Sequence, residues 1–223
     1  MTRRRRTRQQ ARDEILAAAR QRLIAGGPSA VRVELVARDV GVTGAAVHHH
    51  FGNREGLVRE ALRGAVRGLA DQIAGVVARW RPDRLALDEL LATLTGAYRD
   101  DGLARMTAWL VIDGWIPRGR GMFRPIADTL ARARRAARPR SARSPGRGAR
   151  GAKRPEASDL DDARFAALLL NQVAWTEAFA GEVFHRAVGF PDDAKLTARY
   201  QRWVARLVTR TITGEPEEPG GLP

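Results

Sequence analysis

The sequence of 223 residues contains no cysteine, which excludes disulfide bonds and thiolate chemistry. It also lacks any apolar run of about 18 residues, so no membrane-spanning helix is expected. The basic N-terminus is not followed by the apolar segment of a secretory signal. These absences favour a cytoplasmic protein with no membrane partner.

Signals for catalysis are scarce as well. The chain has only four serines, and the Gly-x-Ser-x-Gly, HExxH and phosphate-loop motifs are missing. None of the serines belongs to a recognisable arrangement of nucleophile and base. The sequence therefore predicts no enzyme, no catalytic residues and no cofactor.

Patterns typical of strands are also lacking, because no segment alternates apolar and polar residues over a sustained length. Apolar residues recur instead at helical intervals, and they make up 44% of the chain, enough to bury a core. The expected fold is all-α, with about nine helices. They are expected to run from Asp13 to a break at Gly26-Gly27-Pro28, over 33–40 and 43–51, from an N-cap at Asn53 to Pro82, and over 84–99, 103–115, 122–137, 159–187 and 192–212.

The net charge of +14 is unevenly distributed. Residues 1–60 carry 12 basic and 6 acidic groups, and residues 132–155 carry 10 basic groups and no acidic one. Residues 156–223, by contrast, carry 7 basic and 11 acidic groups. Such asymmetry suggests a polyanionic partner at one end of the chain and a different role at the other.

Composition also suggests where the domains lie. We expect a disordered basic arm over 1–9, one domain over 10–70 and a second domain over 71–213. Within the second domain, residues 138–157 are rich in Arg, Gly, Pro and Ser and cannot pack a core, so a disordered loop is expected there. Residues 214–223 are expected to form a disordered tail.

Three adjacent histidines, His48, His49 and His50, invite interpretation as a metal site. A helix advances by about 100° per residue, so these three side chains point in different directions. Ligands on one helix need spacings of about three or four residues to share a metal ion. We therefore predict no metal site.

The residues around these histidines favour a helix-turn-helix over about 33–51. Ala37 is small where two helices would cross, Gly41 suits the turn between them, and Val47 fills the wedge. Thr43 is placed to cap the following helix and to face a phosphate. The exposed face of that helix would then carry Gly44, Ala45, His48 and His49. An ordinary helical hairpin in a core is the alternative, but the basic arm and the charge favour DNA.

Residues 12–62 resemble the N-terminal domain of the tetracycline-repressor (TetR) family of bacterial regulators. The resemblance lies in "ILAAARQRLIAGG" and "ELVARDVGVTGAAVHHHFGNREGLVREAL", where "GVT", "HHHF" and "GNRE" match family elements in order and spacing. The rest of the chain resembles the family only in its length and helical pattern. The resemblance implies that 10–70 is a DNA-binding domain and 71–213 a ligand-binding and dimerisation domain.

This resemblance implies DNA contacts. Thr43 and His48 occupy positions that usually touch phosphates, His49 usually faces bases or phosphates, and Arg54 matches a phosphate-binding lysine at the start of a helix. The chain departs from the family where Gly44 replaces a common lysine and His48 the usual tyrosine. The arm Arg3–Arg6 is expected to enter a minor groove, or else to be a solvated tail. The expected contact set is Arg4, Arg5, Arg32, Thr43, Gly44, Ala45, His48, His49 and Arg54.

The resemblance also implies a homodimer formed by the last two helices, whose apolar stripes are broader than one neighbouring helix covers. Residues expected at that interface are Phe184, Tyr200, Trp203 and Leu207. A largely apolar small-molecule effector is expected between helices. The residues expected around it are Trp109, Asp113, Phe123, Asn171, Trp175 and Phe179.

These features predict a ligand-responsive repressor that binds an inverted-repeat operator as a dimer and is released by its effector. The alternative is a non-specific nucleic-acid-binding or architectural protein driven by the Arg-rich arm and loop. The loop either adds phosphate contacts or is a low-complexity insertion with no role.

Overall fold

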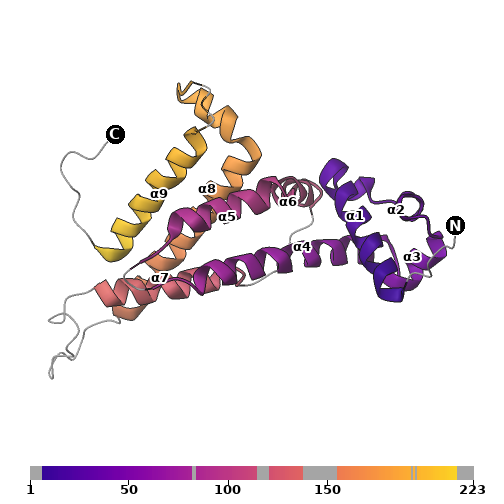
Figure 1. Cartoon of the computed structure of the whole chain (residues 1–223), viewed down its shortest axis with the longest axis horizontal. Coiled ribbons are helices and arrows are strands. Elements are labelled where there is room, and N and C mark those ends of the chain that lie inside the picture. Colours follow the sequence, from indigo (N-terminus) through magenta and orange to yellow (C-terminus); the bar gives the residue numbers. More distant parts are fainter. Residues whose placement is uncertain are drawn as a thin grey trace. The chain divides into compact units, whose positions relative to one another are not determined.

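The computed structural model describes residues 7–81, 84–114, 121–137, 155–191, 193 and 195–214. Within these ranges the chain forms nine helices and no strand (Figure 1). The predicted all-α fold is confirmed. Arg4, Arg5, most of the segment expected to be a loop, and residues 215–223 lie outside the described residues.

Helix α1 (Arg8–Ala30) begins earlier than the predicted start at Asp13, so the end of the expected arm is helical. The reason is a capping box at Thr7. Its hydroxyl oxygen accepts a hydrogen bond from the Gln10 backbone N–H at 3.1 Å, and Gln10 Oε1 accepts one from the Thr7 N–H at 2.9 Å. The predicted break is confirmed, because Gly26 and Gly27 have non-helical backbone angles.

Two short helices and one long helix follow α1. Helices α2 (Val33–Val40) and α3 (Gly44–Phe51) have the predicted extents, with Thr43 as the N-cap of α3. Helix α4 (Arg54–Val77) follows Asn53, whose Oδ1 accepts a hydrogen bond from the Gly56 N–H at 2.7 Å. This confirms the predicted cap, although α4 ends before the predicted stop at Pro82.

The remaining helices are α5 (Leu87–Arg99), α6 (Leu103–Ile112), α7 (Arg124–Ala137), α8 (Pro155–Ala187) and α9 (Leu196–Thr213). Helix α8 begins inside the segment predicted to be a loop up to residue 157. Proline is favoured at the first position of a helix, where its missing N–H has no partner to lose. Within α8 the backbone departs from helical geometry at Ala180, with φ −148° and ψ 19°.

These helices gather into two compact units. Unit 1 comprises Met1–Leu69 and Arg99–Arg118, and unit 2 comprises Ala70–Tyr98 and Gly119–Pro223. Unit 1 therefore includes α6, which the sequence analysis placed in the second domain. None of the described helices is both long and apolar enough to cross a membrane.

Each unit has its own core. In unit 1, α1 packs against α2 and α6, and α2 packs against α3. In unit 2, α7, α8 and α9 pack against one another. Fully buried large side chains in unit 1 include Ile15, Leu23, Leu57, Met106 and Leu110, and those in unit 2 include Ile73, Leu87, Leu90, Leu91, Leu94, Ile126 and Leu130.

Candidate nucleic-acid interface

Helices α2 and α3 are joined by a tight left-handed turn at Gly41, which has φ 70° and ψ 42°. A side chain there would have open space around it, so the backbone conformation is what favours glycine. After the turn, the Val42 N–H donates a hydrogen bond to the Ala37 carbonyl at 2.9 Å. Ala37, Val36 and Val47 are buried between the helices, as the sequence predicted.

Helix α3 begins at Thr43, an exposed N-cap. Its hydroxyl oxygen accepts a hydrogen bond from the Ala46 N–H at 3.2 Å. This bond uses the hydroxyl oxygen as acceptor, so the hydroxyl proton remains able to donate to a phosphate oxygen. Beside it, a Cβ built on Gly44 would lie 3.8 Å from Val33, so packing does not require glycine there.

The exposed side of α3 carries Ala45, His48 and His49. His48 is held in one orientation, because its Nδ1 lies 2.9 Å from the Gly52 carbonyl oxygen. A carbonyl oxygen can only accept, so Nδ1 carries the proton and donates. Nε2 then faces outward as an acceptor in the neutral ring and as a donor in the protonated ring.

The other two histidines diverge from His48. His49 is exposed, whereas His50 is half-buried, and burial followed by the charge of Arg8 lowers the pKa of His50. Phe51 is buried, with the Arg12 guanidinium 5.4 Å from the centre of its ring. Among the described residues, no group of three His, Asp or Glu side chains is arranged to hold a metal ion.

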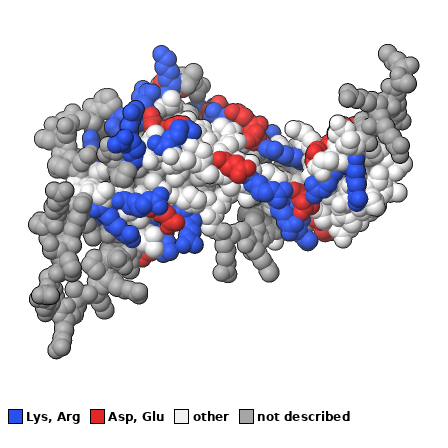
Figure 2. All heavy atoms as spheres, turned by 60° about the horizontal axis from the view of Figure 1, so that its bottom comes forward, with Lys and Arg blue, Asp and Glu red and all other residues white. Residues whose placement is uncertain are grey.

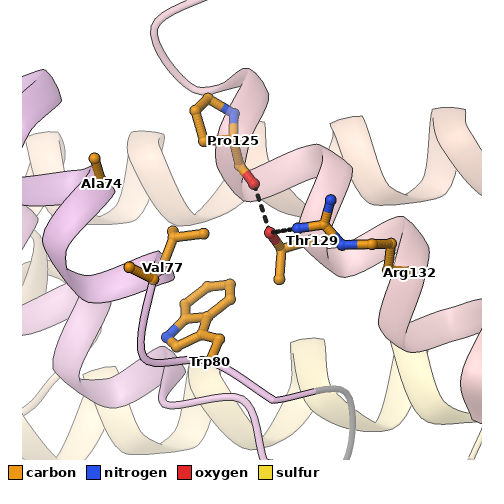
Figure 3. A pocket seen from close by; sticks show the side chains of 7 residues that line it. Ala74, Val77, Trp80, Pro125, Thr129 and Arg132 are labelled. Carbon is orange, nitrogen blue, oxygen red and sulfur yellow. Dashed lines mark hydrogen bonds between the residues drawn. The ribbon is translucent and has the colours of Figure 1, made fainter.

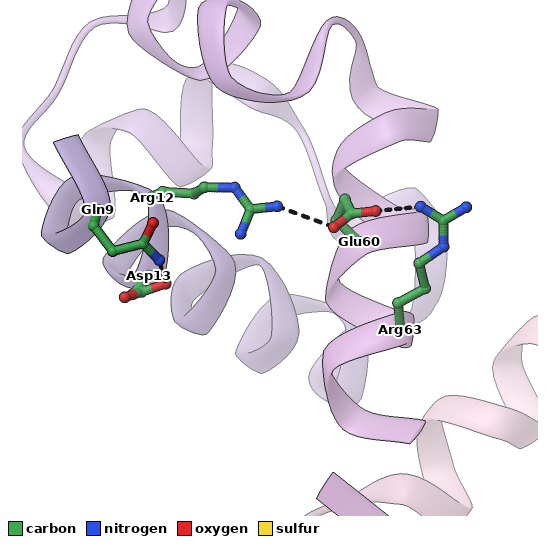
Figure 4. A network of polar contacts seen from close by, with 5 residues as sticks. All are labelled: Gln9, Arg12, Asp13, Glu60 and Arg63. Atoms are coloured by element: carbon green, nitrogen blue, oxygen red, sulfur yellow. Dashed lines mark hydrogen bonds and ion pairs between the residues drawn. The ribbon is translucent and has the colours of Figure 1, made fainter. Parts of the chain in front are cut away.

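Ion pairs that were not predicted from the sequence join the helices around α3. Arg12 of α1 pairs with Glu60 of α4 at 3.0 Å, and Glu60 also pairs with Arg63 (Figure 4). Arg22 of α1 pairs with Asp39 of α2 at 2.6 Å. The partners in the Arg12–Glu60 and Arg22–Asp39 pairs lie on different helices, so no spacing within one helix signals them.

Two arginines expected to contact DNA, Arg32 and Arg54, lie outside α3. Arg32 is exposed at the N-cap of α2, beside the helix-turn-helix. Arg54 differs from the expectation, because its guanidinium turns inward. Its Nε donates to the Val31 carbonyl at 2.9 Å, and its Nη2 donates to the Pro28 carbonyl.

Charge is mixed on the face of the molecule that Figure 2 shows. In the face shown in Figure 2, basic and acidic side chains of the described residues alternate, and no broad basic field is visible on that face. Ala45, His48 and His49 add no permanent positive charge to α3. The exposed side of this helix therefore offers a methyl group and imidazoles but no permanent charge.

The six residues expected around an effector are divided between the two units. Trp109 and Asp113 belong to unit 1, and Trp109 packs against Gly27 of α1. In unit 2, the Tyr98 hydroxyl donates to Asn171 Oδ1, and burial raises the pKa of Tyr98 to about 12. The rings of Trp175 and Phe179 stack with centroids 5.0 Å apart, while Phe123 is half-buried ahead of α7.

The residues expected at a dimer interface lie closer together. Phe184, Tyr200 and Trp203 line a groove of about 810 Å³ between α8 and α9, and Leu207 is exposed farther along α9. The groove also contains two ionisable side chains close together, because His185 Nε2 lies 3.0 Å from the carboxylate of buried Glu177. The rings of Tyr200 and Trp203 stack at its α9 side.

A second cavity, of about 350 Å³, lies in unit 2 beside the end of α4 (Figure 3). Its polar edge is formed by Arg132, which donates to the Thr129 hydroxyl at 2.7 Å, while that hydroxyl donates to the Pro125 carbonyl. Trp80, Val77 and Ala74 supply apolar walls. None of the six expected effector residues lines this cavity or the α8–α9 groove.

Comparison with known proteins assigns the N-terminal region. Residues 15–61 match the family model described as bacterial regulatory proteins, tetR family. The match covers α2 and α3 completely, together with most of α1 and the start of α4. No curated protein matches the sequence.

Solved structures extend the similarity to the whole fold. A transcriptional regulator from Rhodococcus sp. Rha1 is 14% identical, with a TM-score of 0.60 over 92% of this chain and 99% of that one. A candidate TetR-family transcriptional regulator from Mesorhizobium loti is 16% identical, with a TM-score of 0.59 over 94% and 98%. The ketosteroid transcriptional regulator KstR2 of Mycobacterium tuberculosis is 18% identical, with a TM-score of 0.52 over 93% and 95%.

Proposed function

Because this chain belongs to the TetR family of transcriptional regulators, we propose that it is a ligand-responsive repressor that binds an inverted-repeat operator as a homodimer. The observation that carries the proposal is the α2–α3 arrangement. A buried face of Val47 and Phe51 holds α3 against the domain, while the opposite side presents Ala45, His48 and His49. That is the arrangement in which a recognition helix enters a major groove.

Thr43 and Arg32 are the proposed phosphate contacts, because both are exposed beside the first turns of α3 and α2. Gly44 and Ala45 allow close approach, and the Ala45 methyl suits the methyl group of thymine. His48 and His49 supply the polar contacts of α3. The arm with Arg4 and Arg5 is proposed to reach a minor groove, where arginine is favoured.

A homodimer is proposed from the apolar surface of unit 2. Phe184, Trp203 and Leu207 are exposed by 56%, 43% and 44%, which is unusual for large apolar side chains on a monomer surface. Phe184 of α8 and Trp203 of α9 line the same groove, and Leu207 lies farther along α9. A two-fold dimer built on this surface would present two copies of α3 to two half-sites.

Effector control is proposed by analogy with the family. A largely apolar molecule bound in unit 2 would favour one position of α4 and so lower the affinity for the operator. This requires only that the molecule bind two conformations of the protein with different affinities. Helix α4 runs from Arg54 in unit 1 to Val77 in unit 2, so one helix belongs to both units. No step of this mechanism requires catalysis.

The deciding experiment is selection from random duplex DNA by the full-length protein at near-physiological salt. We expect enrichment of an inverted repeat with half-sites about one helical turn apart or slightly more. Tight binding that yields no consensus and collapses as salt rises would instead indicate the non-specific, architectural protein. A variant with Thr43→Val and His49→Ala should lose the selected site, whereas a Glu34→Gln control on α2 should keep it.

A further inference from the structure

Arg54 is the first residue of α4, yet its side chain contacts the turn between α1 and α2. Its Nε donates to the Val31 carbonyl at 2.9 Å, and its Nη2 donates to the Pro28 carbonyl. Pro28 and Val31 are both buried, with Val31 fully inaccessible to solvent. A cation from one helix therefore donates to the carbonyls of two buried residues, and the Pro28 carbonyl also accepts from the Val31 N–H at 3.1 Å.

Helix electrostatics explain this orientation. A positive charge at the start of a helix opposes the helix dipole, so Arg54 gains nothing from its own helix. The last carbonyls of α1 carry partial negative charge, and cations are stabilised there. The Glu55 carboxylate lies 3.6 Å from Arg54 Nη1 and partly offsets the unfavourable interaction of the Arg54 charge with the dipole of α4. Only the planar, forked guanidinium donates at two points in a fixed geometry; a lysine ammonium does not.

One of the two carbonyls that Arg54 contacts lies next to the start of α2. Val31 directly precedes Arg32, the N-cap of α2, whose carbonyl accepts hydrogen bonds from the N–H groups of Leu35 and Val36. Helix α2 in turn holds α3 through the Gly41 turn. The Arg54 bonds thus connect the start of α4 to the helix that supports the recognition helix.

We propose that Arg54 is a positioning residue for the recognition helix, acting through Pro28 and Val31 and not through a DNA phosphate. This inference rests on the proposed function, since it concerns how operator binding is organised. It gives Arg54 a role different from that of a phosphate-binding lysine at the same place. It also provides a link by which displacement of α4 reaches α2 and α3.

The experiment compares Arg54→Lys and Arg54→Gln with the wild-type protein and with Arg67→Gln, which removes an exposed charge elsewhere on α4. Affinity for the selected inverted repeat and for random duplex DNA is measured over a range of salt concentrations, well below the melting temperature of each variant. We expect Arg54→Lys to lose about tenfold in affinity for the inverted repeat. Its affinity for random duplex and its salt slope should equal those of the wild type.

Two results would overturn the proposal. If Arg54→Lys binds like the wild type while Arg54→Gln loses about one unit of salt slope, Arg54 contacts a phosphate. If both variants bind both DNAs like the wild type and only melt earlier, the bonds stabilise the fold without positioning α3. Arg67→Gln is expected to leave the preference for the inverted repeat unchanged.

Failure of the proposed function would look different. If the wild-type protein selects no DNA site, the proposed function is wrong, whatever the Arg54 variants show. In that case amide hydrogen exchange still tests the structural link. Arg54→Lys should exchange the Leu35 and Val36 amides faster than the wild type, and unchanged exchange there would refute the link.

Discussion

The Arg22 guanidinium of α1 and the Asp39 carboxylate of α2 meet at two points, Nε to Oδ2 at 2.6 Å and Nη2 to Oδ1 at 2.8 Å. This two-point pair holds the first helix of the helix-turn-helix against α1. The hydrogen bonds from Arg22 lower the pKa of Asp39 below its ordinary value. The same pair raises the pKa of Arg22.

A pH dependence follows from the lowered pKa of Asp39. The charged carboxylate is favoured in the folded state, so its contribution to stability is present above the ordinary carboxylate range and is lost as pH falls through the lower folded-state pKa. Asp39→Asn should therefore lower the melting temperature at pH 7, and the difference from wild type should shrink in acid. Thermal melting from pH 7 to pH 2 measures this, with Glu34→Gln as control. A difference that stays constant into acid would contradict it.

The cap of α3 can be tested at Thr43. Thr43→Val keeps the shape but removes the oxygen that accepts from the Ala46 N–H, and losing such a cap costs about 1 kcal/mol. Thr43→Ser keeps the oxygen and should retain most of that stability. Urea denaturation gives the free energy of unfolding for each. A loss in Thr43→Ser with none in Thr43→Val would mean that the threonine methyl, and not the cap, matters.

Because Gly27 contacts Trp109, we expect a single methyl group added at Gly27 to lower stability strongly. Gly27 has φ 70° and ψ −170°, which only glycine adopts readily, and a Cβ there would lie 3.0 Å from the Trp109 ring. Gly27→Ala should therefore lower the free energy of unfolding by about 1–3 kcal/mol. Gly68→Ala, at an open helical position of α4, should instead raise stability by about 0.5–1 kcal/mol.

A double variant separates the two causes at Gly27. Adding Trp109→Ala to Gly27→Ala removes the ring but leaves the backbone strain. If the double variant regains part of the lost stability relative to Trp109→Ala alone, the ring contact contributes. Full additivity would assign the whole effect to the backbone conformation.

A substitution on α9 tests the proposed dimer surface. Trp203→Glu places a charge on an apolar surface, and burying an unpaired charge is strongly unfavourable. The variant should be monomeric in light scattering at micromolar concentration, while the wild type is dimeric. Arg202→Glu, one residue away and exposed, is the matched control and should remain dimeric. A dimeric Trp203→Glu protein would place the interface elsewhere.

Prediction from the sequence succeeded where the signal was local. The turn at Gly41, the cap at Thr43, the cap at Asn53 and the break at Gly26-Gly27 depend on residues that are neighbours in the chain. It failed at the start of α1, where the Thr7–Gln10 capping box precedes the first apolar residue and so escapes a search based on periodicity.

The sequence by itself determined that this chain is all-helical, that a helix-turn-helix lies near its N-terminus, and that the three histidines diverge, because hydrophobic period, turn chemistry and helical geometry are local properties. Only the tertiary structure decided that Arg54 faces carbonyls of the α1–α2 turn, that Trp109 packs on Gly27, and that Arg22 pairs with Asp39. Side chains that meet across helices depend on how whole helices pack, and no spacing within one segment records that.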